Sequence, residues 1–133
     1  MLYQLTPNQL AVAKAMSEAK LQANFTDAAE KIGWRWHHET DSRKSPRGLP
    51  DIILVHVVQR RIIFVELKNM TRKETLEQLQ WRHDVADAGG EAYLFRPTDW
   101  MGDLIQDVLK GDKVLTEETG RYTYACPRLG DAA

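Results

Sequence analysis

The chain has 133 residues, 43% of them apolar and 28% charged, so we expect one globular domain over residues 1–133 and exclude wholesale disorder. A single cysteine, Cys126, excludes an internal disulfide, and the longest apolar run, Ile52 to Val58, is too short to cross a bilayer, so a soluble cytoplasmic protein is expected. The net charge of −1 hides an asymmetry: residues 34–73 carry nine basic and four acidic side chains, whereas residues 74–133 carry six and twelve. Charge alone therefore fits a face that binds a polyanion and an ordinary solvated surface equally well.

The first predicted elements are helices that end at Gly33. Thr6, Pro7 and Gln9 together form a typical helix start, and Ser17 either caps a second helix or lies within a continuous one. Helical spacing of the apolar residues places Glu18 in the middle of the core-facing stripe. A carboxylate there is costly unless it is neutralised or ligated, although at a helix start it can also reach solvent or the helix dipole.

Three strands are predicted next. Residues 34–38 alternate as in a strand, and residues 39–50 form a polar, positively charged loop. The β-branched runs 52–58 and 62–68 are separated by a short turn at 59–61, which favours an antiparallel hairpin.

The rest of the chain is predicted to continue with a helix, a strand and a last helix. Residues 73–88 have a helical pattern that Gly89 and Gly90 end, and residues 92–96 form a strand. Thr98 or Asp99 then caps a helix that runs to Gly111. Residues 112–133 form an extension with a short hairpin near Gly120 and no readable role, and the predicted order is α-β-β-β-α-β-α.

The predicted hairpin gathers three charged side chains at one strand end. Asp51 would lie opposite Lys68 or its neighbour, with Glu66 one rung away, and Glu66 and Lys68 project from the same side of their strand. Two close carboxylates repel unless a proton or cation lies between them, and oxygen ligands suit Mg²⁺ or Mn²⁺. The backbone carbonyl of Leu67 offers a further ligand, and Lys68 could orient or deprotonate a water or stabilise transition-state charge. An ordinary surface ion pair is the competing interpretation of this pattern.

Further motifs match a known family in order and spacing. They are Glu18, the run Gly48-Leu49-Pro50-Asp51, the run Val65-Glu66-Leu67-Lys68, the pair Gln78 and Trp81, and Gly89-Gly90. With these motifs the sequence resembles the virus-type replication-repair nucleases (VRR-Nuc) of the PD-(D/E)xK nuclease superfamily. The resemblance spans roughly residues 17–110.

The resemblance implies a fold and a set of roles. The fold would be α/β, with a restriction-endonuclease-like αβββαβ core and a central mixed sheet flanked by helices. Asp51 and Glu66 would ligate Mg²⁺, with Mn²⁺ able to substitute, and Lys68 would act as general base or stabilise charge. Glu18 would be a supporting carboxylate that reaches the metal through a water, and Gln78 would be an active-site group. The helical wheel agrees for Gln78, since it directs the amide toward the sheet.

Basic and polar side chains near this cluster are predicted to contact DNA phosphates, which position a duplex without reading its sequence. His37 and His38 are adjacent on a strand and cannot chelate one ion together, so a zinc site is not favoured. The four tryptophans are expected to pack in the core rather than stack on bases. The predicted DNA contacts are Arg35, His38, Ser42, Arg43, Lys44, Arg47, Arg72 and Lys73.

The sequence therefore predicts a divalent-metal-dependent DNA endonuclease. A junction- or flap-selective substrate and a role in DNA repair fit the resemblance, as does a phage origin, and cutting two strands would call for a homodimer. One alternative is a non-catalytic nucleic-acid-binding module with the same fold. A scaffolding protein is a second alternative, and it would lack salt-sensitive DNA affinity.

Overall fold

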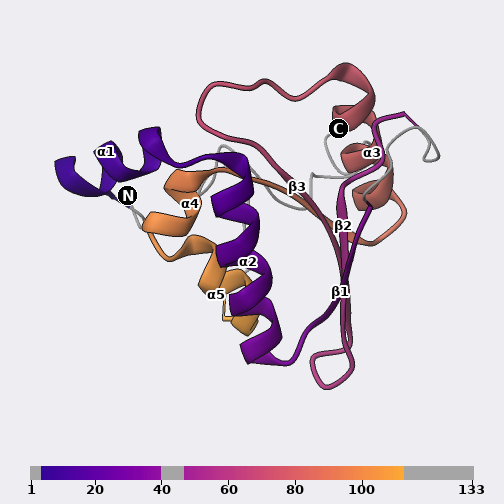
Figure 1. The fold of residues 1–133 in the computed structure, drawn as a ribbon. Helices are drawn as coiled ribbons and strands as arrows, with labels where there is room; N and C mark the ends of the chain where they lie inside the picture. The colour runs from indigo at the N-terminus through magenta and orange to yellow at the C-terminus, as the bar shows by residue number, and fades with distance from the viewer. Residues whose placement is uncertain (1–3, 40–46, 113–133) are drawn as a thin grey trace.

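A four-stranded mixed sheet forms the centre of the molecule (Figure 1). The computed structural model describes residues 4–39 and 47–112. The strands are β1 (Arg35–His38), β2 (Ile52–His56), β3 (Arg61–Leu67) and β4 (Glu91–Phe95), in that spatial order. β1 with β2 and β2 with β3 are antiparallel, whereas β3 and β4 are parallel. A parallel pair needs a crossover connection, which the intervening helix α3 (Leu76–Asp87) provides.

The helices cover the two faces of this sheet unequally. α2 (Glu18–Ile32), α4 (Pro97–Met101) and α5 (Leu104–Lys110) lie on one side, and α3 lies on the other, against β3 and β4 (Figure 1). α1 (Pro7–Ala15) packs against α4. This arrangement confirms the predicted α/β fold with a mixed sheet flanked by helices.

Caps in the sequence decide where the first helices begin and end. Thr6 and Gln9 form the expected capping box of α1. The Oγ of Ser17 accepts a hydrogen bond from the backbone N of Lys20 at 3.0 Å, so Ser17 starts a separate helix. Gly33 ends α2 with a φ of 101°, a left-handed conformation that favours glycine.

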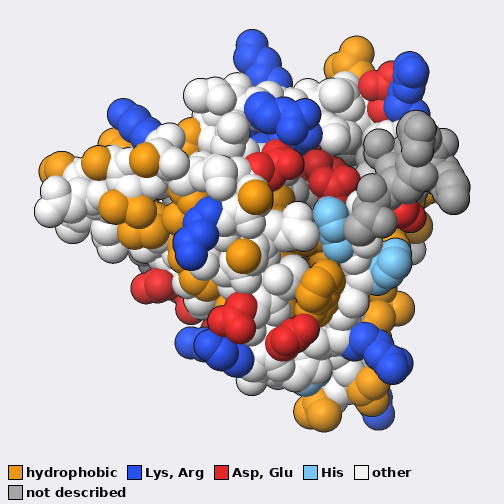
Figure 2. Space-filling model, viewed as in Figure 1, with side chains coloured by type: hydrophobic (Ala, Val, Ile, Leu, Met, Phe, Trp, Pro, Cys, Tyr) orange, Lys and Arg blue, Asp and Glu red, His pale blue; other side chains and the backbone are white. Residues whose placement is uncertain are grey.

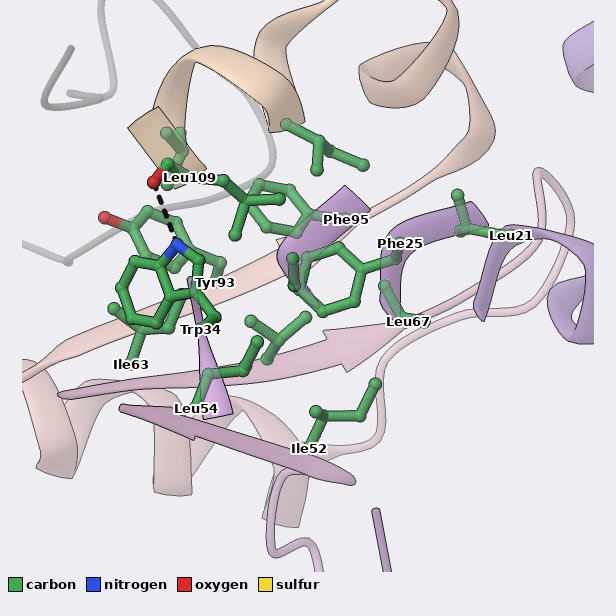
Figure 3. Close-up of a cluster of buried hydrophobic side chains, with 14 of the residues drawn as sticks. Leu21, Phe25, Trp34, Ile52, Leu54, Ile63, Leu67, Tyr93, Phe95 and Leu109 are labelled. Carbon is green, nitrogen blue, oxygen red and sulfur yellow. Dashed lines mark hydrogen bonds between the residues drawn. The ribbon is translucent and has the colours of Figure 1, made fainter. Parts of the chain in front are cut away.

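The core lies between the sheet and the α2, α4 and α5 side (Figure 3). Alternation along the strands directs Ile52, Leu54, Ile63 and Val65 into it. The indole Nε1 of Trp34 donates to the carbonyl of Leu109 at 2.9 Å, which satisfies its one polar atom inside the core. Trp36 and Trp100 are partly buried against the same cluster, so core packing is confirmed for three of the four tryptophans.

The β2–β3 hairpin differs from its prediction in both turn and register. β2 ends at His56, the turn spans residues 57–60, and Val57 and Val58 are 83% and 88% exposed. These valines resembled strand residues because β-branched side chains favour strands, but here they lie in the turn. Ile52 pairs with Val65, so Asp51 falls level with Glu66; the predicted position opposite Lys68 was wrong.

Two later helix boundaries also differ. The helix expected over 73–88 begins only at Leu76, because Thr75 and Gln78 form a capping box. The last predicted helix is two helices, because Gly102 and Asp103 interrupt the helical conformation. Asp103 has a φ of 66°, which an α-helix does not allow. The hairpin expected near Gly120 lies outside the described residues. Among the helices of the described ranges, none is both long and apolar enough to cross a membrane.

Candidate active site

Glu66 lies near the end of β3 and Lys68 directly follows the strand, both on the side opposite its core-facing residues. Ile63, Val65 and Leu67 belong to the core, so alternation turns Glu66 and Lys68 to the other side. Both are nevertheless buried, at 4% and 3% exposure. Lys68 Nζ lies 3.4 Å from Glu66 Oε2. A buried pair of this kind does not fit the surface ion pair that was the competing interpretation.

Asp51 approaches this pair from the neighbouring strand. It directly precedes Ile52, and the register places it level with Glu66. Its carbonyl accepts a hydrogen bond from the backbone N of Glu39 at 3.0 Å, which extends the β1–β2 pairing to this point. The structure thus brings together the three side chains that the sequence gathered, although in a different register.

The electrostatics of the cluster are unbalanced. Burial, and then repulsion by Asp51, raise the pKa of Glu66 to about 8, while Lys68 acts in the opposite direction. Glu66 Oε1 is buried and accepts no hydrogen bond. One lysine therefore does not compensate two carboxylates, and the site favours either a proton on Glu66 or an additional cation.

Glu18 is the first residue of α2, and its partly exposed side chain is paired with a cation. Its Oε1 is buried without a hydrogen bond and lies 3.5 Å from Arg72 Nη1. Arg72 follows Lys68 by four residues, so this ion pair brings the start of α2 to the loop that leaves the site. Acidic side chains gather in the middle of the face shown in Figure 2, beside basic side chains and a histidine.

The loop before Asp51 rests on the start of α3. Gly48 has a φ of +84°, and a Cβ added there would lie 2.4 Å from the backbone carbon of Glu77. Trp81 Nε1 donates to the carbonyl of Arg47 at 3.1 Å. Trp81 therefore holds the loop from a half-buried position, in contrast to the core role expected for it. Both contacts explain why the run from Gly48 to Asp51 needs its glycine and a tryptophan on α3.

Gln78 takes a direction that the helical wheel did not predict. Its Oε1 accepts from the backbone N of Thr75 at 2.9 Å, and its own backbone N donates to Thr75 Oγ1. The side chain oxygen thus caps α3 rather than pointing toward the sheet. Thr75-x-x-Gln78 is a capping-box pattern, so the sequence contained the signal for this contact.

The residues predicted to contact DNA are distributed around the site. His38 pairs with Ile52 at the Asp51 end of the hairpin, whereas Arg35 pairs with Val55, three positions further away. Arg47, Arg72 and Lys73 are exposed, and Arg47 Nη1 lies 3.8 Å from Glu77 Oε1. Ser42, Arg43 and Lys44 lie outside the described residues.

Two residues that shape the loop after Lys68 were not among the predicted site residues. The Oδ1 of Asn69 accepts hydrogen bonds from the backbone N atoms of Thr71 and Arg72, and Asn in such turns is a readable signal. Arg96 donates to the carbonyls of Asn69 and Arg72. These contacts span 27 and 24 residues, and no local pattern predicts them.

The donor set of the cluster fits a hard divalent cation. Asp51 and Glu66 supply carboxylate oxygens from adjacent strands, and the buried Glu66 Oε1 still lacks a hydrogen bond. Over residues 4–39 and 47–112, no group of three or more His, Cys, Asp or Glu side chains could hold a metal. A cation at this pair would therefore complete its coordination with backbone or water oxygens.

The comparisons with known proteins identify the family. A model of the VRR-NUC domain matches residues 4–98, from before α1 into α4, so it includes α1, which the sequence resemblance left out. The searches of curated proteins and of solved structures gave no match. The match spans the whole sheet and all three residues of the cluster, and it covers well over half of the chain. The chain therefore belongs to the VRR-NUC domain family, and this membership indicates a nuclease-type function.

Proposed function

We propose that this protein is a divalent-metal-dependent DNA endonuclease that hydrolyses phosphodiester bonds. The observation that carries the proposal is the convergence of Asp51, Glu66 and the buried Lys68 at one end of the β2–β3 hairpin. A domain that only binds nucleic acid gains nothing from carboxylates that face a phosphate, because like charges repel.

Asp51 and Glu66 would hold Mg²⁺, with Mn²⁺ able to substitute. The carbonyl of Leu67 would serve as a further ligand, and Glu18 would act through a water. When bound, the ion supplies Lewis acidity toward the phosphodiester and lowers the pKa of a water. Glu66 then has to give up the proton that its raised pKa favours, so metal binding is coupled to pH.

Lys68 provides the positive charge that the chain itself brings to the reaction. Its ammonium is buried, so bulk water screens the charge only weakly. The Nζ atom lies 3.4 Å from Glu66 Oε2. From there Nζ can orient the attacking water or stabilise negative charge that develops on the phosphate. The products would be a 5′-phosphate and a 3′-hydroxyl.

The surrounding cations would hold the DNA backbone. Three of these cations, Arg47, Arg72 and Lys73, are exposed and lie outside the helices. They are therefore placed to contact phosphates rather than to read bases from a helix in a groove. Such a surface fits recognition of DNA shape, and we propose a junction or flap as substrate, with Arg35 and His38 as further contacts. A homodimer would supply the second site that cutting of both strands requires.

Cleavage of labelled junction, flap, single-stranded and duplex DNA with Mg²⁺, Mn²⁺ or EDTA tests the proposal. We expect metal-dependent cutting by the wild-type protein and loss of cutting in Asp51→Ala. Equal cleavage by both proteins would rule out the mechanism. Salt-sensitive binding without metal-dependent cutting would favour the non-catalytic module, and absence of DNA affinity would favour a scaffolding role.

A further inference from the structure

The loop between β3 and α3 is held in one conformation by Asn69. Its side-chain Oδ1 accepts from the backbone N of Thr71 at 3.0 Å, from Thr71 Oγ1 at 3.1 Å and from the backbone N of Arg72 at 2.8 Å. By accepting from three donors within the next three residues, this one oxygen stabilises a tight turn. We call residues 69–72 the Asn69 turn.

Arg96 fastens this turn to the end of β4. Its Nη1 donates to the carbonyl of Asn69 at 2.6 Å and to the carbonyl of Arg72 at 2.7 Å. The backbone beside it is also fixed, because Lys68 N donates to the carbonyl of Phe95 at 3.1 Å and Arg96 N donates to Asp99 Oδ2 at 2.8 Å. One guanidinium therefore bridges both ends of the Asn69 turn from a rigid position.

The Asn69 turn lies between two charged side chains of the site. Lys68 immediately precedes it, and Arg72 ends it, 3.5 Å from Glu18 and 62% exposed. The turn thus determines where the buried ammonium and the exposed guanidinium stand relative to each other. Besides the bond from Arg72 N to Asn69 Oδ1 within the turn itself, Arg96 bridges both ends of the turn from a segment that is distant in the sequence.

We propose that Arg96 is a positioning residue for the site: by clamping the Asn69 turn it keeps Lys68 beside Glu66 and directs Arg72 toward a substrate phosphate. The inference rests on the proposed nuclease function. A guanidinium has the reach and the planar donor geometry to bind two carbonyls at once, which a lysine ammonium reproduces only in part. Hydrogen bonds from a charged donor to a backbone carbonyl are also stronger than those from a neutral donor.

Amide hydrogen exchange tests the clamp independently of activity. In Arg96→Met we expect exchange at Thr71 and Arg72 to accelerate by about tenfold or more, while Val65 and Phe95 in the sheet keep their protection. Arg96→Lys should fall between wild type and Arg96→Met. Lys31→Gln, which removes a surface charge at the far end of α2, serves as the control and should leave all four amides unchanged.

Two exchange results would overturn the clamp. Unchanged protection at Thr71 and Arg72 would show that Arg96 does not hold the turn. Equal acceleration at the turn and in the sheet would show a general folding role instead. Asn69→Ala provides a second variant, since it opens the same turn without changing Arg96 and should accelerate the same amides.

Cleavage kinetics then test the catalytic consequence. Arg96→Met should lower kcat/KM by about 10- to 100-fold per folded molecule, as loss of a ligand-orienting contact does, with partial recovery in Arg96→Lys. Adding Asn69→Ala to Arg96→Met should cost little more, because both act on one turn. Full activity per folded molecule, or strictly additive losses, would overturn the positioning role. A wild-type protein that cuts no DNA would overturn the proposed function and this catalytic role with it, whereas the exchange data would still decide whether Arg96 holds the turn.

Discussion

The two ends of the central sheet both hold charged side chains, partly buried at one end and buried at the other, but they compensate these charges differently. At the start of β3, Arg61 binds both carboxylate oxygens of Glu91 at 2.9 and 2.7 Å and also donates to the carbonyl of Val108. Burial alone would raise the pKa of Glu91, but hydrogen bonds from Arg61 and Tyr93 outweigh it and lower that pKa. At the other end of β3, the pKa of Glu66 is raised to about 8 and its Oε1 has no hydrogen bond.

This difference separates a structural ion pair from the candidate active site. Besides Glu91 and Val108, Arg61 donates to Gln59 Oε1, and its guanidinium lies over the face of Trp34. The Glu66 end keeps an excess of negative charge that only a proton or a further cation removes. A perturbed carboxylate beside a lysine is typical of a functional site, whereas a satisfied pair is typical of structural support.

The largest expected effect concerns activity at the unbalanced end. Asp51→Asn should lower metal-dependent cleavage by about 10³-fold, because the metal supplies several kcal/mol of charge stabilisation. The free energy of unfolding should change little, since a repelling carboxylate is removed. Single-turnover cleavage with urea denaturation measures both quantities, and Asp27→Asn on the exposed side of α2 is the matched control. Retained cleavage would contradict the comparison.

Breaking the balanced end should affect stability instead. Glu91→Gln leaves Arg61 without its charged partner, and we expect the free energy of unfolding to fall by about 3 kcal/mol. Cleavage per folded molecule should remain at the wild-type level, because Glu91 and Glu66 occupy different ends of the sheet. Urea denaturation checks the first expectation. A variant of normal stability and low activity would reverse the assignment of the two ends.

The loop that carries Asp51 offers a third comparison. Gly48→Ala introduces a side chain at a φ of +84° and against the backbone of Glu77. We expect the free energy of unfolding to fall by about 1–3 kcal/mol, because the loop must move away from α3. Cleavage per folded molecule should also fall below that of the control variant, because this loop carries Asp51. Gly102→Ala is the control, since Gly102 has a φ of −91°, which other residues adopt readily. Equal effects of the two substitutions would contradict the close contact.

The pH dependence of stability should follow Glu66. Its pKa rises from 4.5 to about 8 on folding, so the folded chain keeps a proton that the unfolded chain has lost. Without divalent cations, the free energy of unfolding should therefore fall as pH rises from about 4.5 to about 8, by at most about 1.4 kcal/mol per pH unit. Denaturation in EDTA across this range should show the decline in wild type and a shallower one in Glu66→Gln. Parallel curves would argue against a buried, protonated Glu66.

The smallest effect is expected for two of the predicted DNA contacts, Arg43 and the exposed Arg47. Replacing Arg43 and Arg47 together by methionine should weaken DNA binding a few-fold and lower the dependence of log K on log salt by about two units. Fluorescence anisotropy at several salt concentrations measures this slope. An unchanged slope would show that these two residues do not touch the DNA backbone.

The sequence predicted the order of the strands, the crossover helix and the cluster because these depend on local signals, although it merged α4 and α5 into one helix. Alternation in β3 alone places Glu66 and Lys68 on one side, and helical spacing alone places Glu18 on the apolar stripe. The predicted register was wrong because Val57 and Val58, which are β-branched, were assigned to the strand. In the structure both lie in the turn. The ion pair of Glu18 with Arg72 and the clamp by Arg96 join distant segments, and no periodicity encodes such contacts.

The docking of the Gly48 loop on α3 also bears on the synthesis of this protein. The segment before Asp51 leans on Glu77 and Trp81, and β3 pairs with β4 only after α3 has crossed over. A nascent chain that has left the ribosome as far as Lys68 holds all three charged groups but none of these supports. Under the proposed function, the ability to cut DNA would then emerge only once the second half of the domain has been translated.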